Sequence, residues 1–126
     1  MLKEGQKYLI SDYSVADATL TICKIEEHPT FGRIVHLCLD GVKVKTSYSP
    51  MGFTTWLAHL PFSEEAVMES VGELVSENAT PHNWERGYRD WKDAFDNGKA
   101  HLWMTTVSHA LLSLANSLEN NAPDNI

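Results

Sequence analysis

The chain is poor in cysteine and has no long apolar run. Only two of its 126 residues are cysteine, too few for the disulfide scaffold of a small secreted domain. No stretch approaches the roughly 18 apolar residues of a membrane-spanning helix, and residues 1–7 do not lead into the apolar core of a signal peptide. We therefore expect a cytoplasmic protein in which Cys23 and Cys38 are reduced thiols.

Positive charge is also scarce. Ten Lys and Arg against 17 Asp and Glu give a net charge of −7. Proteins that bind nucleic acid or anionic membranes through charge need clustered Lys and Arg, so the composition argues against both classes. A basic protein partner is compatible with it. The length suits a single domain over residues 1–126, and a homodimer stays open.

The sequence lacks the familiar motifs of catalysis, nucleotide binding and metal binding. The glycines form no phosphate-binding loop or dinucleotide fingerprint, and no serine lies in a Gly-x-Ser-x-Gly elbow. The six histidines have no metal-ligand spacing. Cys23, Cys38 and His36 could share one sheet face, which leaves a metal site open, but a pair of free thiols is favoured in a reducing cytosol. We assign no catalytic residue, no metal ligand and no cofactor.

Four large aromatic side chains fall on one helical stripe within residues 83–98. They occur at positions 84, 88, 91 and 95, the spacing of a 3.6-residue period. Asn83 is expected to cap this helix, and Asn97 and Gly98 provide a left-handed stop. Because four rings bury a large apolar area, the helix is predicted to anchor the core.

The first half of the chain is predicted to form antiparallel strands. Four segments rich in β-branched residues are candidates: residues 7–11, 18–26, 33–39 and 42–47. Asp40 and Gly41 are predicted to form a two-residue hairpin turn between the last two. This turn places five side chains on the core side: Val35, Leu37, Leu39, Val42 and Val44. Pairing Leu39 with Ile22 across the loop at residues 28–32 puts Cys23 directly opposite Cys38 on the other, wetter side.

The second half is predicted to be helical. Ser63 is placed to cap a helix that runs to about Glu77, residues 101–105 form a short extended piece, and a last helix covers about residues 107–118. The polar tail is expected to fray. Strands followed by helices indicate an α+β fold, with an antiparallel sheet of about four strands and three helices packed on one face.

Two stretches resemble a group of small uncharacterised bacterial proteins. The first is His-Leu-Pro-Phe-Ser-Glu-Glu-Ala at residues 59–66, and the second follows Gly-Tyr-x-x-Trp-x-x-Ala-Phe-x-x-Gly-Lys-Ala at residues 87–100. The match covers less than half of the chain. After it, this sequence has His101, Leu102 and Trp103 where those proteins continue with Gly and Phe. The resemblance implies a shared α+β fold and no established chemistry.

Four glutamates recur every four residues in the predicted helix after Ser63: Glu65, Glu69, Glu73 and Glu77. On a continuous helix they would form one carboxylate ridge, and no Lys or Arg between Phe62 and Trp84 would offset their repulsion. One interpretation is a solvated face that keeps the protein soluble. The other is a docking strip for a basic partner, which would speed association.

Residues 49–62 are unusually apolar for a connection between a sheet and helices. A lid folded over the sheet core is one interpretation of this segment, which contains Trp56 and His59. An exposed aromatic patch used for binding is the other, because contiguous apolar patches usually mark contacts.

The leading hypothesis is a small, non-catalytic, cytoplasmic binding protein, such as an immunity-type inhibitor that neutralises a toxin through an acidic surface. Its expected contact residues are Glu65, Glu69, Glu73, Glu77, Trp56 and His59. The alternatives are a small enzyme with a site near His59 and a homo-oligomeric structural protein that pairs through the Trp56 segment. A cleft with His59 beside a carboxylate of shifted pKa would favour the enzyme, whereas a convex acidic surface would favour the inhibitor.

Overall fold

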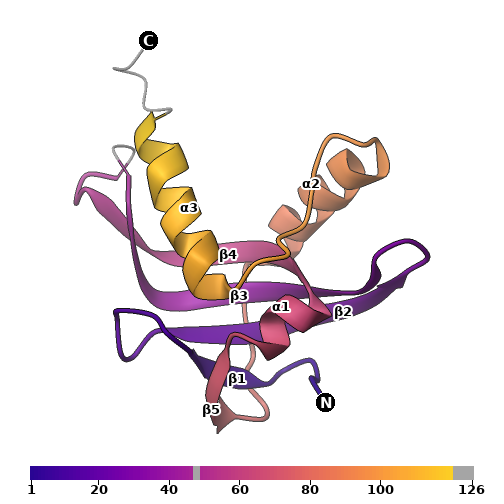
Figure 1. Ribbon diagram of the computed structural model, residues 1–126, viewed down its shortest axis with the longest axis horizontal. Helices are drawn as coiled ribbons and strands as arrows, with labels where there is room; N and C mark the ends of the chain where they lie inside the picture. The colour runs from indigo at the N-terminus through magenta and orange to yellow at the C-terminus, as the bar shows by residue number, and fades with distance from the viewer. Residues whose placement is uncertain (47–48, 121–126) are drawn as a thin grey trace.

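The structure is a computed structural model that describes residues 1–46 and 49–120, except for the side chains of the last five of these residues. Part of the tail that is expected to fray, residues 121–126, lies outside the described residues. Within the described residues, no helix combines the length and the apolar character needed to cross a membrane. The fold is α+β, as predicted, and in the described ranges consists of one five-stranded sheet and three helices (Figure 1).

The sheet has one more strand than the sequence indicated. Its strands are β1 (Lys7–Ile10), β2 (Thr19–His28), β3 (Gly32–Lys45), β4 (Phe53–Ser63) and β5 (Val71–Ser76). Their spatial order is β4-β3-β2-β1-β5, and each neighbouring pair is antiparallel. β4 and β5 are therefore the two edges of the sheet.

The predicted hairpin turn at Asp40 and Gly41 is wrong. β3 runs through both residues, and its pairing with β4 shifts register between Asp40 and Val44. Gly41 has a φ of 69°, a left-handed conformation that occurs here at a β-bulge-like irregularity inside the strand and not in a turn. The irregularity also keeps Leu39 and Val42 on the same side of the sheet. All five side chains predicted for the core face are buried: Val35, Leu37, Leu39, Val42 and Val44.

Most of the apolar segment of residues 49–62 is edge strand β4, and not a loop or a lid. Leu57 and Leu60 of this strand pair with Leu39 and Leu37 of β3 and pack against the core. Trp56, on the opposite side, is 38% exposed. The segment is apolar because one of its faces completes the sheet core, so its composition alone does not define a binding patch.

The predicted helix from Ser63 to about Glu77 is too long. Ser63 caps it as expected, since its hydroxyl accepts a hydrogen bond from Ala66 N, but the helix, α1 (Glu64–Met68), is short and β5 follows. Glycine and β-branched valines disfavour helix in the following residues, and repulsion between glutamates at i, i+4 adds to this. A Cβ at Gly72 would lie 3.2 Å from Leu9 O of β1, which shows how closely β5 approaches that strand.

The apolar face of the sheet is covered by α1 and by α3 (Val107–Asn120). Val67, Val107 and Leu111 of these helices share one buried core with Leu37 and Val44 of β3. The predicted last helix is therefore confirmed. Of the extended piece predicted at residues 101–105, only Trp103 pairs with the sheet, as an isolated bridge: Trp103 N donates to Pro61 O and Ser63 N donates to Trp103 O, both at 2.9 Å.

The aromatic helix, α2 (Glu85–Asp96), lies on the opposite face of the sheet, so the prediction of three helices on one face is wrong. None of its residues is buried, and it does not anchor the main core as expected. Asn83 is not its cap: its φ is 62°, and the N-cap position belongs to Trp84. The predicted stop is confirmed, because Gly98, with a φ of 71°, donates to Phe95 O at 3.0 Å.

Candidate functional site

The structure separates the expected contact residues into two groups. Glu65 lies on α1, Glu69 at its C-cap, Glu73 on β5 and Glu77 directly after β5, and all four are exposed. They do not form one helical ridge, because the helix ends at Met68. Trp56 and His59 lie on β4, at the other edge of the sheet. Four strand spacings of about 4.8 Å place the two edges roughly 19 Å apart.

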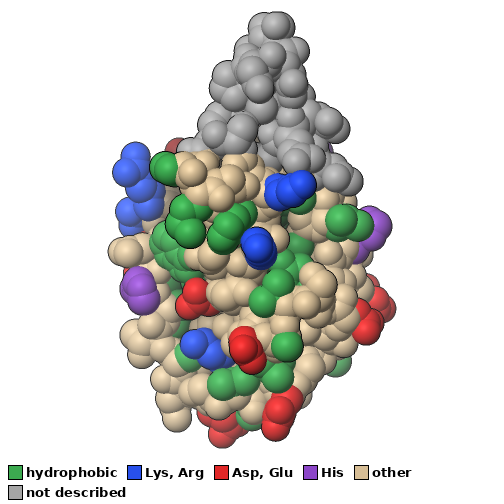
Figure 2. Space-filling view, turned by 90° about the vertical axis from the view of Figure 1, so that its left-hand side faces the viewer, with side chains coloured by type: hydrophobic (Ala, Val, Ile, Leu, Met, Phe, Trp, Pro, Cys, Tyr) green, Lys and Arg blue, Asp and Glu red, His purple; other side chains and the backbone are tan. Residues whose placement is uncertain are grey.

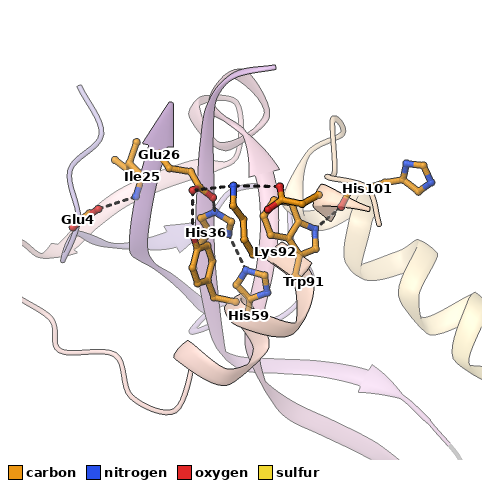
Figure 3. A network of polar contacts seen from close by, with 10 residues as sticks. Glu4, Ile25, Glu26, His36, His59, Trp91, Lys92 and His101 are labelled. Atoms are coloured by element: carbon orange, nitrogen blue, oxygen red, sulfur yellow. Dashed lines mark hydrogen bonds and ion pairs between the residues drawn. The ribbon is translucent and has the colours of Figure 1, made fainter. Parts of the chain in front are cut away.

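His59 belongs to a polar cluster that the sequence did not reveal. The cluster, here called the His36 cluster, consists of Glu26, His36, His59, Tyr88 and Lys92. Its members come from β2, β3, β4 and α2, and Figure 3 shows four of them, Glu26, His36, His59 and Lys92, close to one another. Because these residues come from four separate elements, they show no recognisable spacing in the sequence. Predicting the cluster would have required knowledge of the strand pairing and of the position of α2.

A continuous chain of hydrogen bonds runs from Glu26 to His59. His36 Nε2 lies 2.7 Å from Glu26 Oε1, and His36 Nδ1 lies 2.8 Å from His59 Nε2. The carboxylate fixes the proton of His36 on Nε2, so His36 Nδ1 accepts the hydrogen bond and His59 Nε2 donates it. His59 Nδ1 is then left as an acceptor that has no partner among the described residues.

The second carboxylate oxygen of Glu26 binds two side chains of α2. Tyr88 Oη donates to Glu26 Oε2 at 3.0 Å, and Lys92 Nζ lies 3.8 Å from the same oxygen. Burial raises the pKa of Glu26, but the hydrogen bonds from His36 and Tyr88 and the charge of Lys92 outweigh it, so the net shift is downward. Glu26 is therefore ionised at neutral pH.

Burial sets the charge of the two histidines. It lowers the pKa of His59 to about 4 and lowers the pKa of His36 despite the hydrogen bond to Glu26. Burial and the hydrogen bond to Glu26 raise the pKa of Tyr88 to about 12. At neutral pH the cluster thus holds one carboxylate, two neutral imidazoles and a protonated phenol.

Aromatic rings enclose the histidine pair. The rings of His36 and His59 are stacked, with centroids 5.0 Å apart, and Tyr88 and Trp91 present their faces or edges to His36 at 4.8 and 5.0 Å. Trp91 in turn stacks on Phe95 at 4.4 Å. The aromatic stripe that was expected to anchor the main core therefore packs on these polar side chains instead.

The chemical capacity of the His36 cluster is limited by its packing. No buried side-chain nitrogen or oxygen in the described part of the chain lacks a hydrogen-bond partner. The four described cavities are lined by other residues. Among the described residues, no three His, Cys, Asp or Glu side chains are grouped so as to hold a metal ion. Apart from His59 Nδ1, which solvent can reach, the cluster is a hydrogen-bonded polar layer between the sheet and α2.

Both cysteines are free and lie on the face covered by α2, but the predicted pairing is wrong by two residues. Cys38 pairs with Thr21, and Cys23 lies at a bulge between Ile22 and Lys24. The two thiols are still neighbours, since a hydrogen bond between them shifts the pKa of both. Both are buried, at 9% and 7% exposed, so this face is drier than expected.

Comparison of the chain with protein-family profiles, with curated proteins and with solved structures finds no match.

Proposed function

We propose that this protein acts as a binding protein, of the kind of an immunity-type inhibitor, and that it binds a basic protein partner along the β5 edge of its sheet. The observation that carries this proposal is the combination of an open edge strand with four exposed carboxylates around it. These are the four glutamates that the sequence predicted to lie on one helix, and in the structure they lie on and around β5.

The strand itself supports binding of an extended segment. Within the described residues β5 pairs with β1 only, so its outer edge offers backbone donors and acceptors to an added strand. Leu74 and Val75 are 41% and 53% exposed, which provides apolar contact beside the backbone hydrogen bonds. A partner segment in extended conformation satisfies both features.

The charge around β5 selects a basic segment. No Lys or Arg occurs between Phe62 and Trp84, so the carboxylates of this region face no cation from their own stretch of chain. Figure 2 shows acidic side chains along the lower rim of the molecule, at the height at which β5 lies in Figure 1. Such a rim raises the association rate with a cationic partner and repels acidic ones.

The alternative of an enzyme near His59 has one specific observation in its favour, the chain from Glu26 through His36 to His59. A histidine with a pKa near 4 is a poor general base, about a thousandfold weaker in proton affinity than one with a pKa near 7. The binding role therefore agrees better with the geometry than the catalytic one does.

A labelled extended peptide of alternating Lys and Val tests the proposal. We expect it to bind the wild type with strong salt dependence and to perturb the amide signals of Val71–Ser76 in NMR spectra. The variant Glu69→Lys/Glu73→Lys should bind more slowly and with less salt dependence. Its matched control is Asp90→Lys/Asp93→Lys, which makes the same charge change on α2. Equal loss in both variants, or perturbation confined to the Trp56 region, would contradict the proposed edge.

A further inference from the structure

Cys38 borders a small cavity. The cavity has a volume of about 70 Å³, and Cys38 lines it together with Lys7, Trp56 and His82. The neighbouring residue Ala79 donates its N–H to Gly5 O at 2.9 Å, which holds this wall of the cavity against the chain before β1. Since liquid water occupies roughly 30 Å³ per molecule, the space suits a ligand of about two oxygen atoms.

The sulfur of Cys38 accepts one side-chain hydrogen bond and lies beside the Cys23 thiol. Trp56 Nε1 donates to Cys38 Sγ at 3.3 Å. The Cys23 thiol has two acceptors within reach, Thr21 O at 3.6 Å and Cys38 Sγ. The hydrogen of the Cys23 thiol can rotate between these two acceptors. When Cys38 is a thiolate, its sulfur is a stronger acceptor than Thr21 O. The surroundings of Cys38 therefore stabilise a thiolate.

The electrostatics divide the two thiols into different roles. The hydrogen bond from Cys23, and then that from Trp56, lowers the pKa of Cys38 to about 7 although burial opposes the shift. The same hydrogen bond and burial raise the pKa of Cys23. Cys38 is thus the nucleophile of the pair, and Cys23 is the thiol that keeps its proton.

We propose that Cys38 and Cys23 form a dithiol site that reduces small hydroperoxides, with Cys38 as the attacking thiolate and Cys23 as the resolving thiol. Cys23 lies on β2 and Cys38 on β3, and neither strand is the β5 edge, so this inference does not depend on the proposed binding function. Its ligand class follows from the cavity beside Cys38, which has room for a molecule of the size of hydrogen peroxide.

The reaction balances in two steps. The Cys38 thiolate attacks one oxygen of hydrogen peroxide, the O–O bond breaks, and hydroxide leaves, so that Cys38 is oxidised to sulfenic acid. The sulfur of Cys23 then attacks the sulfur of Cys38, the S–S bond forms, and the hydroxyl group leaves as water with the Cys23 proton. Cys23 has no strand partner at its bulge, so it can approach Cys38 without breaking a ladder pair. A small dithiol reductant restores both thiols by exchange.

Stopped-flow reaction of the reduced protein with hydrogen peroxide tests the proposal, with the same chain unfolded in urea as the reference. At pH 7 we expect the folded protein to lose both thiols about threefold faster than the unfolded chain, because a larger thiolate fraction outweighs its lower nucleophilicity. Mass spectrometry should then find the loss of two hydrogens and a bridged peptide that joins Cys23 to Cys38.

Three variants assign the roles. Cys23→Ser should stop at a sulfenic acid on Cys38 that dimedone traps, and Cys38→Ser should lose the fast phase. Trp56→Phe should slow the reaction severalfold, whereas the control Trp84→Phe, at the start of α2, should not. Folded thiols that react more slowly than unfolded ones, or a first oxidation that falls on Cys23, would overturn the proposal. If Cys38→Ser does not fold, the dimedone adduct in Cys23→Ser still tests whether Cys38 is the attacking thiolate, because the adduct marks the cysteine that formed the sulfenic acid.

Discussion

Gly87 of α2 packs directly on His59 of β4: a Cβ at position 87 would lie 3.0 Å from His59 Cβ. The contact explains how a helix without buried residues is held at a fixed distance from the sheet. It also places the aromatic stripe of the helix at the height of the histidine rings. The glycine is therefore required by packing, although its position in a helix is unfavourable by propensity.

Gly87→Ala should destabilise the protein. Alanine gains about 1 kcal/mol in helix propensity, but the added methyl group must push α2 off β4, and overpacking typically costs about 1–3 kcal/mol. We expect a net loss on the order of 1 kcal/mol in urea denaturation. Arg89→Ala, on the exposed side of the same helix, is the control and should change stability little. A Gly87→Ala protein more stable than the wild type would show that the helix does not rest on His59.

Acid should weaken the fold through the histidine pair. Burial holds the pKa of His59 at about 4, below the roughly 6.5 expected for the unfolded chain, so the unfolded state binds more protons between these values. Stability from this group is complete above about pH 6.5 and is lost as the pH falls toward 4. The lowered pKa of His36 acts in the same direction. After allowance for the partial exposure of His59, its share is on the order of 2 kcal/mol.

Urea midpoints at pH 7, 6, 5 and 4 measure this dependence, and His59→Phe provides the comparison. The variant removes the titrating group but keeps a ring beside His36, so its stability should fall less steeply over this range. The difference between the two proteins isolates His59 from the carboxylates, which titrate in both. Parallel curves would mean that His59 has the same proton affinity in the folded and unfolded states.

Trp91→Ala should cost less than a buried tryptophan normally does. The ring is half-buried, stacks on Phe95 at 4.4 Å, and donates from Nε1 to His101 O at 2.8 Å. Full burial would predict about 3–5 kcal/mol, and we expect about 2 kcal/mol here. Trp91→Phe keeps the stacking and removes the hydrogen bond, and should cost about 1 kcal/mol. Calorimetric unfolding of both variants checks that Trp91→Ala loses more stability than Trp91→Phe. If the ring were an unpacked surface side chain, the two variants would have similar stabilities.

The sequence predicted the buried side of β3 but not the path of the chain through it. Alternation of apolar residues identifies a core face wherever a strand is half-buried, so Leu37 and Val44 could be assigned. A glycine after an aspartate is common in tight turns and also in bulges, and local sequence does not distinguish them. The distinction depended on β4, whose pairing extends on both sides of Asp40.

The error in the second half has a similar cause. Glutamates four residues apart match a helical period, yet Glu73 lies on a strand. Residues 71–76 pair with the edge of β1, and this tertiary pairing outweighed the weak local preference for helix. For the candidate site, the sequence predicted His59 and the carboxylates around β5 as contact residues, and their role in binding stays a prediction. The sequence did not predict that His59 is connected to Glu26, because the connection runs through His36 and depends on the packing of α2 on the sheet.

Ser70 connects α1 with α3, and its loss should be costly. The hydroxyl donates to Ala66 O at 2.6 Å and accepts from Val107 N at 2.9 Å, and the residue is 1% exposed. Ser70→Ala leaves the buried N–H of Val107 without its acceptor, which costs about 1–3 kcal/mol. The control is Ser76→Ala, because the Ser76 hydroxyl accepts from Asn78 N at an exposed site where water can replace it. Urea denaturation should separate the two variants by at least about 1 kcal/mol. Equal stabilities would show that Val107 N finds another acceptor, and that the start of α3 is not held by this serine.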